Sequence, residues 1–182
     1  MIEDLSLATE QELLEQCLRN NRTAQKVIYE RLSPRMFSVC IRYIGERERA
    51  KDVLHDGFIT LFSKIGTYKN EGSFEGWARR IFVNTALMQI RKADVLKHSD
   101  DLDKLHTDMP IETHIGEKID NAKLFSLIAK MPVGFRTVFN LYVIEGFTHA
   151  EIAKELNITE GGSRSQLSRA KEWLKVRIKQ YE

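Results

Sequence analysis

The chain has 182 residues, of which 42% are hydrophobic and 30% are charged, and its formal net charge at pH 7 is +2. This size suits one or two small globular domains, and the charge content excludes a fibrous or membrane-embedded protein. No apolar run approaches the roughly 20 residues of a membrane span, and the acidic start lacks the basic and apolar regions of a signal peptide, so we expect a cytoplasmic protein.

The residue pattern predicts an all-α protein. The chain contains only three Pro, and its apolar residues recur mostly at helical spacing. Cys17 and Cys40 lie among apolar helical residues, where a free Cys acts as a small hydrophobe. Two isolated cysteines make neither a disulfide framework nor a zinc site, so we expect both to be reduced and buried. No metal or other cofactor is expected.

The start of the chain predicts three helical segments. Thr9 and Glu12 have the spacing of a capping box, in which each side chain satisfies a backbone N–H of the first helical turn. A second helix is expected over residues 24–32. The Ser-Pro pair that ends at Pro34 predicts a turn or kink, because the residue before Pro avoids αR. A third, strongly apolar helix is expected from there to about residue 45.

The next expected helix, residues 46–65, has an apolar face and an acidic face. Helical spacing brings Asp52, Asp56 and Ile59 together on the acidic face, with His55 at its margin. One interpretation is a solvated helix face. An apolar residue between acids also suits docking onto a basic protein surface. Catalysis by His55 and Asp56 is not expected, because no partner constellation surrounds them.

A polar, glycine-punctuated loop, GTYKNEGSFEG, leads into the following helix, expected over residues 77–92. Arg80, Asn84 and Arg91 share one face of that helix. Together with aromatic residues of the loop and helix, this face resembles a platform on which single-stranded bases stack while Arg and Lys hold phosphates. Burial of Phe74 and Trp77 in the core is the competing interpretation. The expected core stripe is Trp77, Ala78, Ile81, Thr85 and Met88.

Residues 93–117 lack sustained periodicity and are acidic, so we interpret them as a linker between two helical domains. Two helices are expected after it, over residues 118–130 and 133–145, with Pro132 in the break between them.

The stretch from Phe147 to Leu174 predicts a helix-turn-helix. Thr148 and Glu151 form a second capping box, and Asn157 suits the tight turn because Asn tolerates positive φ. The second helix is expected to open near Thr159, with an apolar stripe that anchors it. Arg164, Ser165, Ser168, Lys171 and Lys175 lie on another arc, where a recognition helix contacts DNA. A solvated, basic helix end is the alternative.

Two features of this second helix depart from a standard motif. Gly161 and Gly162 weaken its start by about 1 kcal/mol each relative to Ala. Ser163 falls on the inward arc, where an aliphatic residue is expected.

Taken together, the chain resembles the extracytoplasmic-function (ECF) sigma factors of the sigma-70 family over nearly its whole length. VIYERLSPRMFSVCIRYIGERERAKDVLHDGFITLF is similar to the family's opening helices, and GSFEGWARRIFVNTALMQIRK to its promoter-melting helix. The segment from Lys130 to Leu174 resembles the family's C-terminal domain without a gap. The resemblance implies an N-terminal sigma domain over residues 1–94, a linker over 95–117 and a C-terminal domain over 118–182.

What the resemblance implies is a non-enzymatic subunit that binds core RNA polymerase and opens promoter DNA. The linker would thread toward the RNA exit path, and the flap region is a further polymerase contact. Whether an anti-sigma factor also binds stays open. Docking on the clamp helices of the largest subunit would use Asp52, His55, Asp56 and Ile59. Unpaired bases of the minus-10 element would meet Tyr68, Lys69, Phe74, Trp77, Arg80, Asn84 and Arg91. The minus-35 duplex would meet Thr159, Arg164, Ser165, Ser168, Arg169 and Lys171.

A LuxR-like transcription regulator with a helical N-terminal sensor domain is the alternative. It predicts stable duplex binding by the isolated protein, whereas a sigma factor predicts specific transcription only with core polymerase. The family usually has an aliphatic residue where Ser163 stands, Gly where Asn157 stands and Gln where His55 stands.

Overall fold

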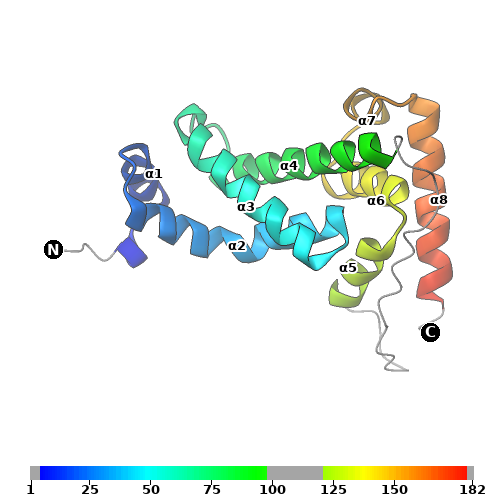
Figure 1. The fold of residues 1–182 in the computed structure, drawn as a ribbon, viewed down its shortest axis with the longest axis horizontal. Helices are drawn as coiled ribbons and strands as arrows, with labels where there is room; N and C mark the ends of the chain where they lie inside the picture. The colour runs from blue at the N-terminus through cyan, green and yellow to red at the C-terminus, as the bar shows by residue number, and fades with distance from the viewer. Residues whose placement is uncertain (1–4, 98–120, 180–182) are drawn as a thin grey trace. The chain divides into compact units, whose positions relative to one another are not determined.

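The computed structural model describes residues 5–97 and 121–179, and within these residues it contains helices and no strand, so the predicted all-α class is confirmed. The chain divides into two compact units. The first is formed by residues 1–41 with 46–91, and the second by residues 42–45 with 92–182. Figure 1 labels their helices along the chain. Each unit is described by itself.

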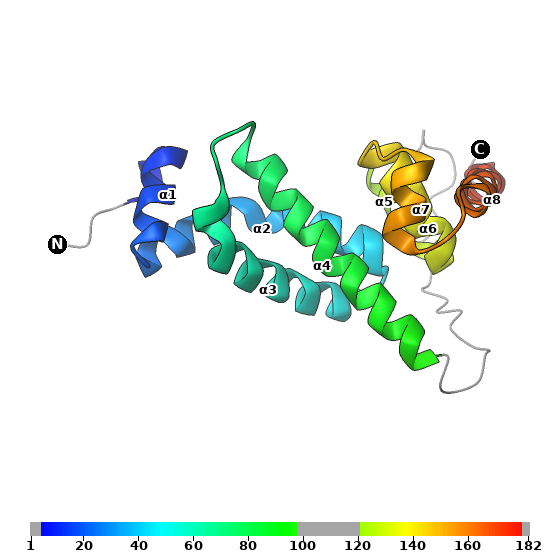
Figure 2. The ribbon, with the colours of Figure 1, turned by 90° about the horizontal axis from the view of Figure 1, so that it is seen from above.

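Among the described residues, the first unit contains two short 3-10 turns and all or most of four α-helices, two of which end in residues of the second unit. Phe58 on α3 packs against Tyr29 on α2 and against Phe82 on α4, with ring centroids 4.5 and 5.0 Å apart, so one aromatic cluster joins three helices. Figure 2 shows the course of these three helices. The Thr9–Glu12 capping box is confirmed at the start of α1. In chain order the elements are η1 (Leu5–Leu7), α1 (Glu10–Leu18), α2 (Arg22–Ile44), α3 (Arg47–Lys64), η2 (Ile65–Thr67) and α4 (Phe74–Lys97).

The predicted break before Pro34 is wrong, because α2 runs through it as one helix. Losing a backbone hydrogen bond at Pro costs about 3 kcal/mol in a helix interior. Ile28 and Leu32 before Pro34, and Met36 and Val39 after it, are all buried. Since burying one such side chain is worth about 1.5–3 kcal/mol, the shared core outweighs the local preference of Pro.

Gly57 on α3 lies directly against the ring of Phe82 on α4. A Cβ atom placed on it would overlap the ring of Phe82, which is itself fully buried. No local sequence pattern distinguishes this glycine from the glycines in loops. Its missing side chain makes room for the ring that the two helices share.

Helix α4 is longer than predicted, and its core stripe differs. It begins at Phe74 and extends to Lys97, which lies within the expected linker. The rest of that linker falls in residues 98–120, which lie outside the described part of the chain. Met88, predicted to be core, is 55% exposed. The buried residues are Phe74, Ala78, Phe82, Val83, Ala86 and Leu87.

Cys17 and Cys40 are free, buried thiols, as predicted. Burial raises the pKa of Cys17 to about 11 and that of Cys40 to about 12. Both thiols therefore stay protonated at neutral pH, and both act as small apolar groups in the core.

The second unit holds the helix-turn-helix. The predicted break at Pro132 is confirmed, with Pro132 at the N-cap of α6. The helix expected to follow it ends differently, because its last turn is a π-helix, a form often found at functional sites. The elements are α5 (Asn121–Lys130), α6 (Val133–Phe139), η3 (Asn140–Ile144), α7 (His149–Leu156) and α8 (Glu160–Ile178).

Candidate nucleic-acid interface

The loop between η2 and α4 is ordered by its own contacts. The Tyr68 hydroxyl donates to the carbonyl of Gly72 at 2.7 Å, closing the loop on itself. Asn70 and Gly72 both take positive φ, which reverses the chain between them. Ser73 accepts from the backbone N–H of Gly76 at 3.1 Å and so caps the start of α4. These hydrogen bonds order the loop and its junction with α4.

Three aromatic rings support that loop from beneath. The ring centroids of Tyr68, Phe74 and Trp77 lie 5.4 to 5.6 Å apart. Phe74 is only 2% exposed, as the interpretation of Phe74 as a core residue expects, so its ring presents little surface to DNA in this structure. Tyr68 and Trp77 are half-buried and keep part of each ring at the surface.

The predicted polar face of α4 is exposed. Arg80, Asn84 and Arg91 all lie at the surface, and Lys69 is exposed on the neighbouring loop. Met88, which the sequence placed in the core, falls within the same arc and adds an apolar surface next to the amide of Asn84. Positive charge, an amide and an apolar patch on one helix face can hold phosphates and stack or cradle bases.

The acidic face of α3 is also at the surface, with one exception. Asp52 and His55 are exposed, and Ile59 is 57% exposed. Asp56 is half-buried, because a carboxylate oxygen accepts from Nε2 of Gln89 on α4 at 3.1 Å. Asp56 therefore helps to join two helices, a role the sequence could not indicate because its partner lies on a different helix.

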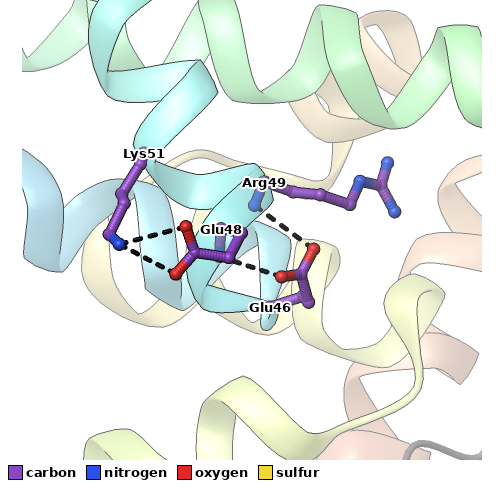
Figure 3. Close-up of polar contacts among 4 residues, drawn as sticks. All are labelled: Glu46, Glu48, Arg49 and Lys51. Carbon is purple, nitrogen blue, oxygen red and sulfur yellow. Dashed lines mark hydrogen bonds and ion pairs between the residues drawn. The ribbon is translucent and has the colours of Figure 1, made fainter.

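The first turn of α3 carries its own, mutually satisfied charges (Figure 3). Glu46 accepts from the backbone N–H groups of Glu48 and Arg49 at 2.9 and 3.2 Å, which caps the helix. Lys51 donates to the carboxylate of Glu48 at 2.8 Å, while the Arg49 side chain points away from Glu46. Asp52, the next acidic residue along α3, is exposed.

The helix-turn-helix has the local geometry that its sequence predicts. The Thr148–Glu151 capping box opens α7, and its hydrogen bonds from Thr148 lower the pKa of Glu151 below the ordinary value. Asn157 closes α7 with φ of 54° and ψ of 46°, the left-handed conformation expected of it. The Thr159 side chain accepts from the backbone N–H of Gly162 at 2.9 Å and caps α8. Its hydroxyl proton stays available to a phosphate.

The basic arc of α8 is exposed as predicted. The exposed polar side chains of this arc and its margin are Arg164, Ser165, Ser168, Arg169, Lys171 and Lys175. Arg164 has a partner that the sequence analysis missed, since the carboxylate of Glu160 accepts from its guanidinium at 2.8 Å. Their spacing of four residues on one helix is the signal that could have revealed it.

Ser163 explains the departure seen in the sequence. It is fully buried, and its hydroxyl lies 2.8 Å from Nδ1 of His149, the first residue of α7. The His149 ring in turn stacks on Tyr142 of η3, with centroids 4.5 Å apart. A polar contact therefore stands where an aliphatic residue was expected.

The described residues show neither a metal centre nor a membrane span. No group of three or more His, Cys, Asp or Glu among them is placed to hold a metal ion. None of the helices in residues 5–97 and 121–179 is long and apolar enough to cross a bilayer.

The comparisons with known proteins match both units. Residues 28–95 match the family model described as Sigma-70 region 2, and residues 122–174 match the one described as Sigma-70, region 4. The chain belongs to the sigma-70 family. It is therefore a sigma factor for promoter recognition and not an enzyme, and the LuxR-like alternative is not favoured, because region 2 stands where a sensor domain was expected.

Similar proteins agree with this membership. The chain is 23% identical to the RNA polymerase sigma-H factor of Pseudomonas aeruginosa, covering 92% of this chain and 93% of that one. It is 24% identical to the ECF RNA polymerase sigma-E factor of Haemophilus influenzae, covering 93% and 95%. The fold resembles that of the sigma factor RpoE of Bartonella quintana, which was solved with the anti-sigma factor NepR. The TM-score is 0.52 and the sequence identity 18%, and the match covers 85% of this chain and 96% of the RpoE chain.

Proposed function

We propose that the chain works in the cytoplasm with core RNA polymerase, docking through α3 and contacting promoter DNA through two separate surfaces. The observation that carries the proposal is the exposure of Arg80 and Asn84 beside an ordered aromatic loop, in a chain that also presents a basic recognition helix. Docking on the largest subunit's clamp helices would use Asp52, His55 and Ile59, with Asp56 supporting that face from its bond to α4.

The surface over the loop and α4 would take unpaired bases of the minus-10 element. The contacting groups are Tyr68, Lys69, Trp77, Arg80, Asn84 and Arg91. Phe74 supports the loop from the core instead of touching DNA. Capture of a base on such a surface is worth about 1–3 kcal/mol per stacked base.

The surface of α8 would read the minus-35 duplex. Arg164, Ser165 and Ser168 lie near the N-terminal end of the helix, where a recognition helix meets base edges. Thr159, Arg169 and Lys171 would hold phosphates. The linker and the flap contact are proposed from the resemblance alone. An anti-sigma factor is a partner to test, because the RpoE relative was solved with one.

Transcription in vitro with purified core polymerase tests the whole proposal. Promoter-specific transcripts are expected only when both the chain and the core enzyme are present, with weak duplex binding by the chain alone. Tight, specific duplex binding by the isolated chain, without promoter-specific transcription, would contradict the proposal.

Asp52→Arg tests the docking surface. It places a positive charge on the acidic face, so co-purification with core polymerase should fall at least about tenfold, as expected for like charges in contact. Glu30→Arg is the matched control, since Glu30 is an exposed acid on α2 and the charge change is the same. Equal retention of polymerase by both variants would remove α3 as the docking helix. Asp56 is unsuitable for this test because of its bond to Gln89.

A further inference from the structure

The contact between His149 and Ser163 joins the two helices of the helix-turn-helix by a directional bond. Ser163 is 0% exposed, and Oγ lies 2.8 Å from Nδ1 of His149. The ring of Tyr142 stacks on a face of the imidazole, with its plane tilted by 22° to it. Three elements, η3, α7 and α8, therefore meet at one polar contact.

Such a contact constrains the helices differently from an apolar one. Apolar side chains tolerate small slides and rotations, because burial is not directional. A hydrogen bond weakens steeply away from its preferred angle, and a buried hydroxyl without a partner costs about 1–3 kcal/mol. A rotation of α8 that broke the contact would leave the hydroxyl of Ser163 without its partner.

The position of Ser163 in α8 makes that constraint relevant to DNA. Arg164 and Ser165 follow it directly, and both are exposed. Successive residues of a helix are turned by about 100°, so the rotation of α8 at Ser163 sets the directions in which the next two side chains leave the helix.

We propose that His149 and Ser163 are positioning residues that fix the rotation of α8 and thereby the base preference at the minus-35 element. This inference rests on the proposed function of α8 and adds determinants that do not themselves touch DNA. His149 acts through Ser163, and Tyr142 holds the imidazole in place.

Isosteric substitutions separate this role from packing. Ser163→Val and Ser163→Thr add nearly the same volume to a buried site, so any overpacking is shared, but only Thr keeps the hydroxyl. His149→Asn and His149→Leu form a second matched pair at a half-buried site, in which only Asn keeps a polar group near the position of Nδ1. If both Ser163 variants fail to fold, the His149 pair alone separates the effect of the hydrogen bond from that of packing.

The measurement is the amount of transcript made by the full chain with core polymerase on two templates. One template is a promoter that the wild type uses, and the other is the same promoter with its minus-35 element scrambled. Discrimination is the ratio of the two amounts. The apolar variants should lose about tenfold in discrimination between the two templates, the size of one lost base contact. The hydrogen-bonding variants should stay close to wild type. Thermal unfolding, measured in parallel, should show all compared variants folded at the assay temperature.

Equal discrimination by the polar and apolar members of each pair would overturn the inference. Wild-type protein that fails to transcribe either template specifically would instead overturn the proposed function. The two failures are therefore distinguishable.

Discussion

The two surfaces proposed to meet DNA are held in place by different means. In the first unit a loop rests on three aromatic rings and on the bond from Tyr68 to Gly72, and the residues beneath it form an aromatic core. In the second unit a single helix is held by the Thr159 cap and by the buried contact between His149 and Ser163. The first arrangement rests mainly on aromatic packing, with one hydrogen bond from Tyr68. The second adds a buried polar contact to the apolar side chains of Leu167 and Ala170, which α8 also buries.

This difference fits the two kinds of DNA. An unpaired base can be accommodated by a loop that adjusts by small movements over a firm base, since stacking tolerates many base orientations. A duplex presents donors and acceptors at fixed positions in its major groove, so the helix that reads them must hold one rotation. Changes in the first unit should therefore act mainly through volume, and changes in the second through hydrogen-bonding capacity.

The largest effect is expected from Gly57→Val, which breaks the packing of the first unit. Its side chain would overlap the ring of Phe82, and overpacking in a close-packed core costs about 1–3 kcal/mol or more. Chemical denaturation should show that loss in the free energy of unfolding. Gly161→Ala is the control, because its Cβ would meet only Oγ1 of Thr159 at 3.9 Å, an ordinary van der Waals contact, and the substitution should stabilise by up to about 1 kcal/mol. A neutral Gly57→Val would mean that α3 and α4 do not share this contact.

Features set by neighbouring residues were the ones that the sequence predicted well. The capping boxes at Thr9 and Thr148 and the left-handed Asn157 depend on residues within one turn, and all three are confirmed. The passage of α2 through Pro34 could not be predicted, because it depends on a core shared with other helices. The role of Gly57 depends on Phe82, a partner on another helix, and no local pattern identifies it.

Asn84→Ala should have the next largest effect, and it tests the surface of the first unit directly. The amide is exposed on α4, so its loss should leave the fold intact and remove a contact to an unpaired base. Open-complex formation should fall about tenfold, corresponding to about 1.4 kcal/mol, while closed-complex formation stays near wild type. Filter binding and permanganate footprinting separate the two steps. An equal loss in both would contradict the assignment to strand capture.

Tyr68→Phe tests whether the hydrogen bond that orders the loop contributes to binding of single-stranded DNA, in addition to the aromatic packing. The substitution keeps the ring against Phe74 and Trp77 and removes only the hydroxyl that donates to Gly72. One hydrogen bond is worth about 0.5–1.5 kcal/mol, so binding of a single-stranded minus-10 oligonucleotide by the holoenzyme should weaken about twofold to twelvefold. Tyr68→Leu, which also removes the ring, should weaken it further. If Tyr68→Phe binds the oligonucleotide as tightly as wild type, the hydroxyl does not order the loop.

For the candidate site, the sequence predicted which side chains are exposed better than it predicted which residues contact each other. It placed Arg80, Asn84 and Arg164 at the surface, and they are exposed. It marked Ser163 as a polar residue on an inward arc, which indicates a buried hydroxyl in need of a partner. It could not identify His149 as that partner, since the two residues come together only when the turn at Asn157 brings α7 and α8 into contact.

The smallest effect is expected from Glu160→Gln. This substitution tests whether the ion pair at the start of α8 contributes to DNA recognition in addition to the buried contact between His149 and Ser163. Glu160 and Arg164 are both largely exposed, so their ion pair contributes only about 0.3–0.5 kcal/mol. Loss of the Glu160 carboxylate removes a negative charge beside the DNA, so non-specific duplex binding should rise about twofold. It also leaves the Arg164 side chain less restricted, so discrimination at the minus-35 element should fall by a similar factor. Glu172→Gln removes the same charge from an exposed site further along α8 and should raise non-specific binding without changing discrimination. Because the two variants carry the same net charge, a difference between them in discrimination can come only from what Glu160 does to Arg164. Identical behaviour of the two would show that the second unit reads DNA without this pair and relies on the buried contact alone.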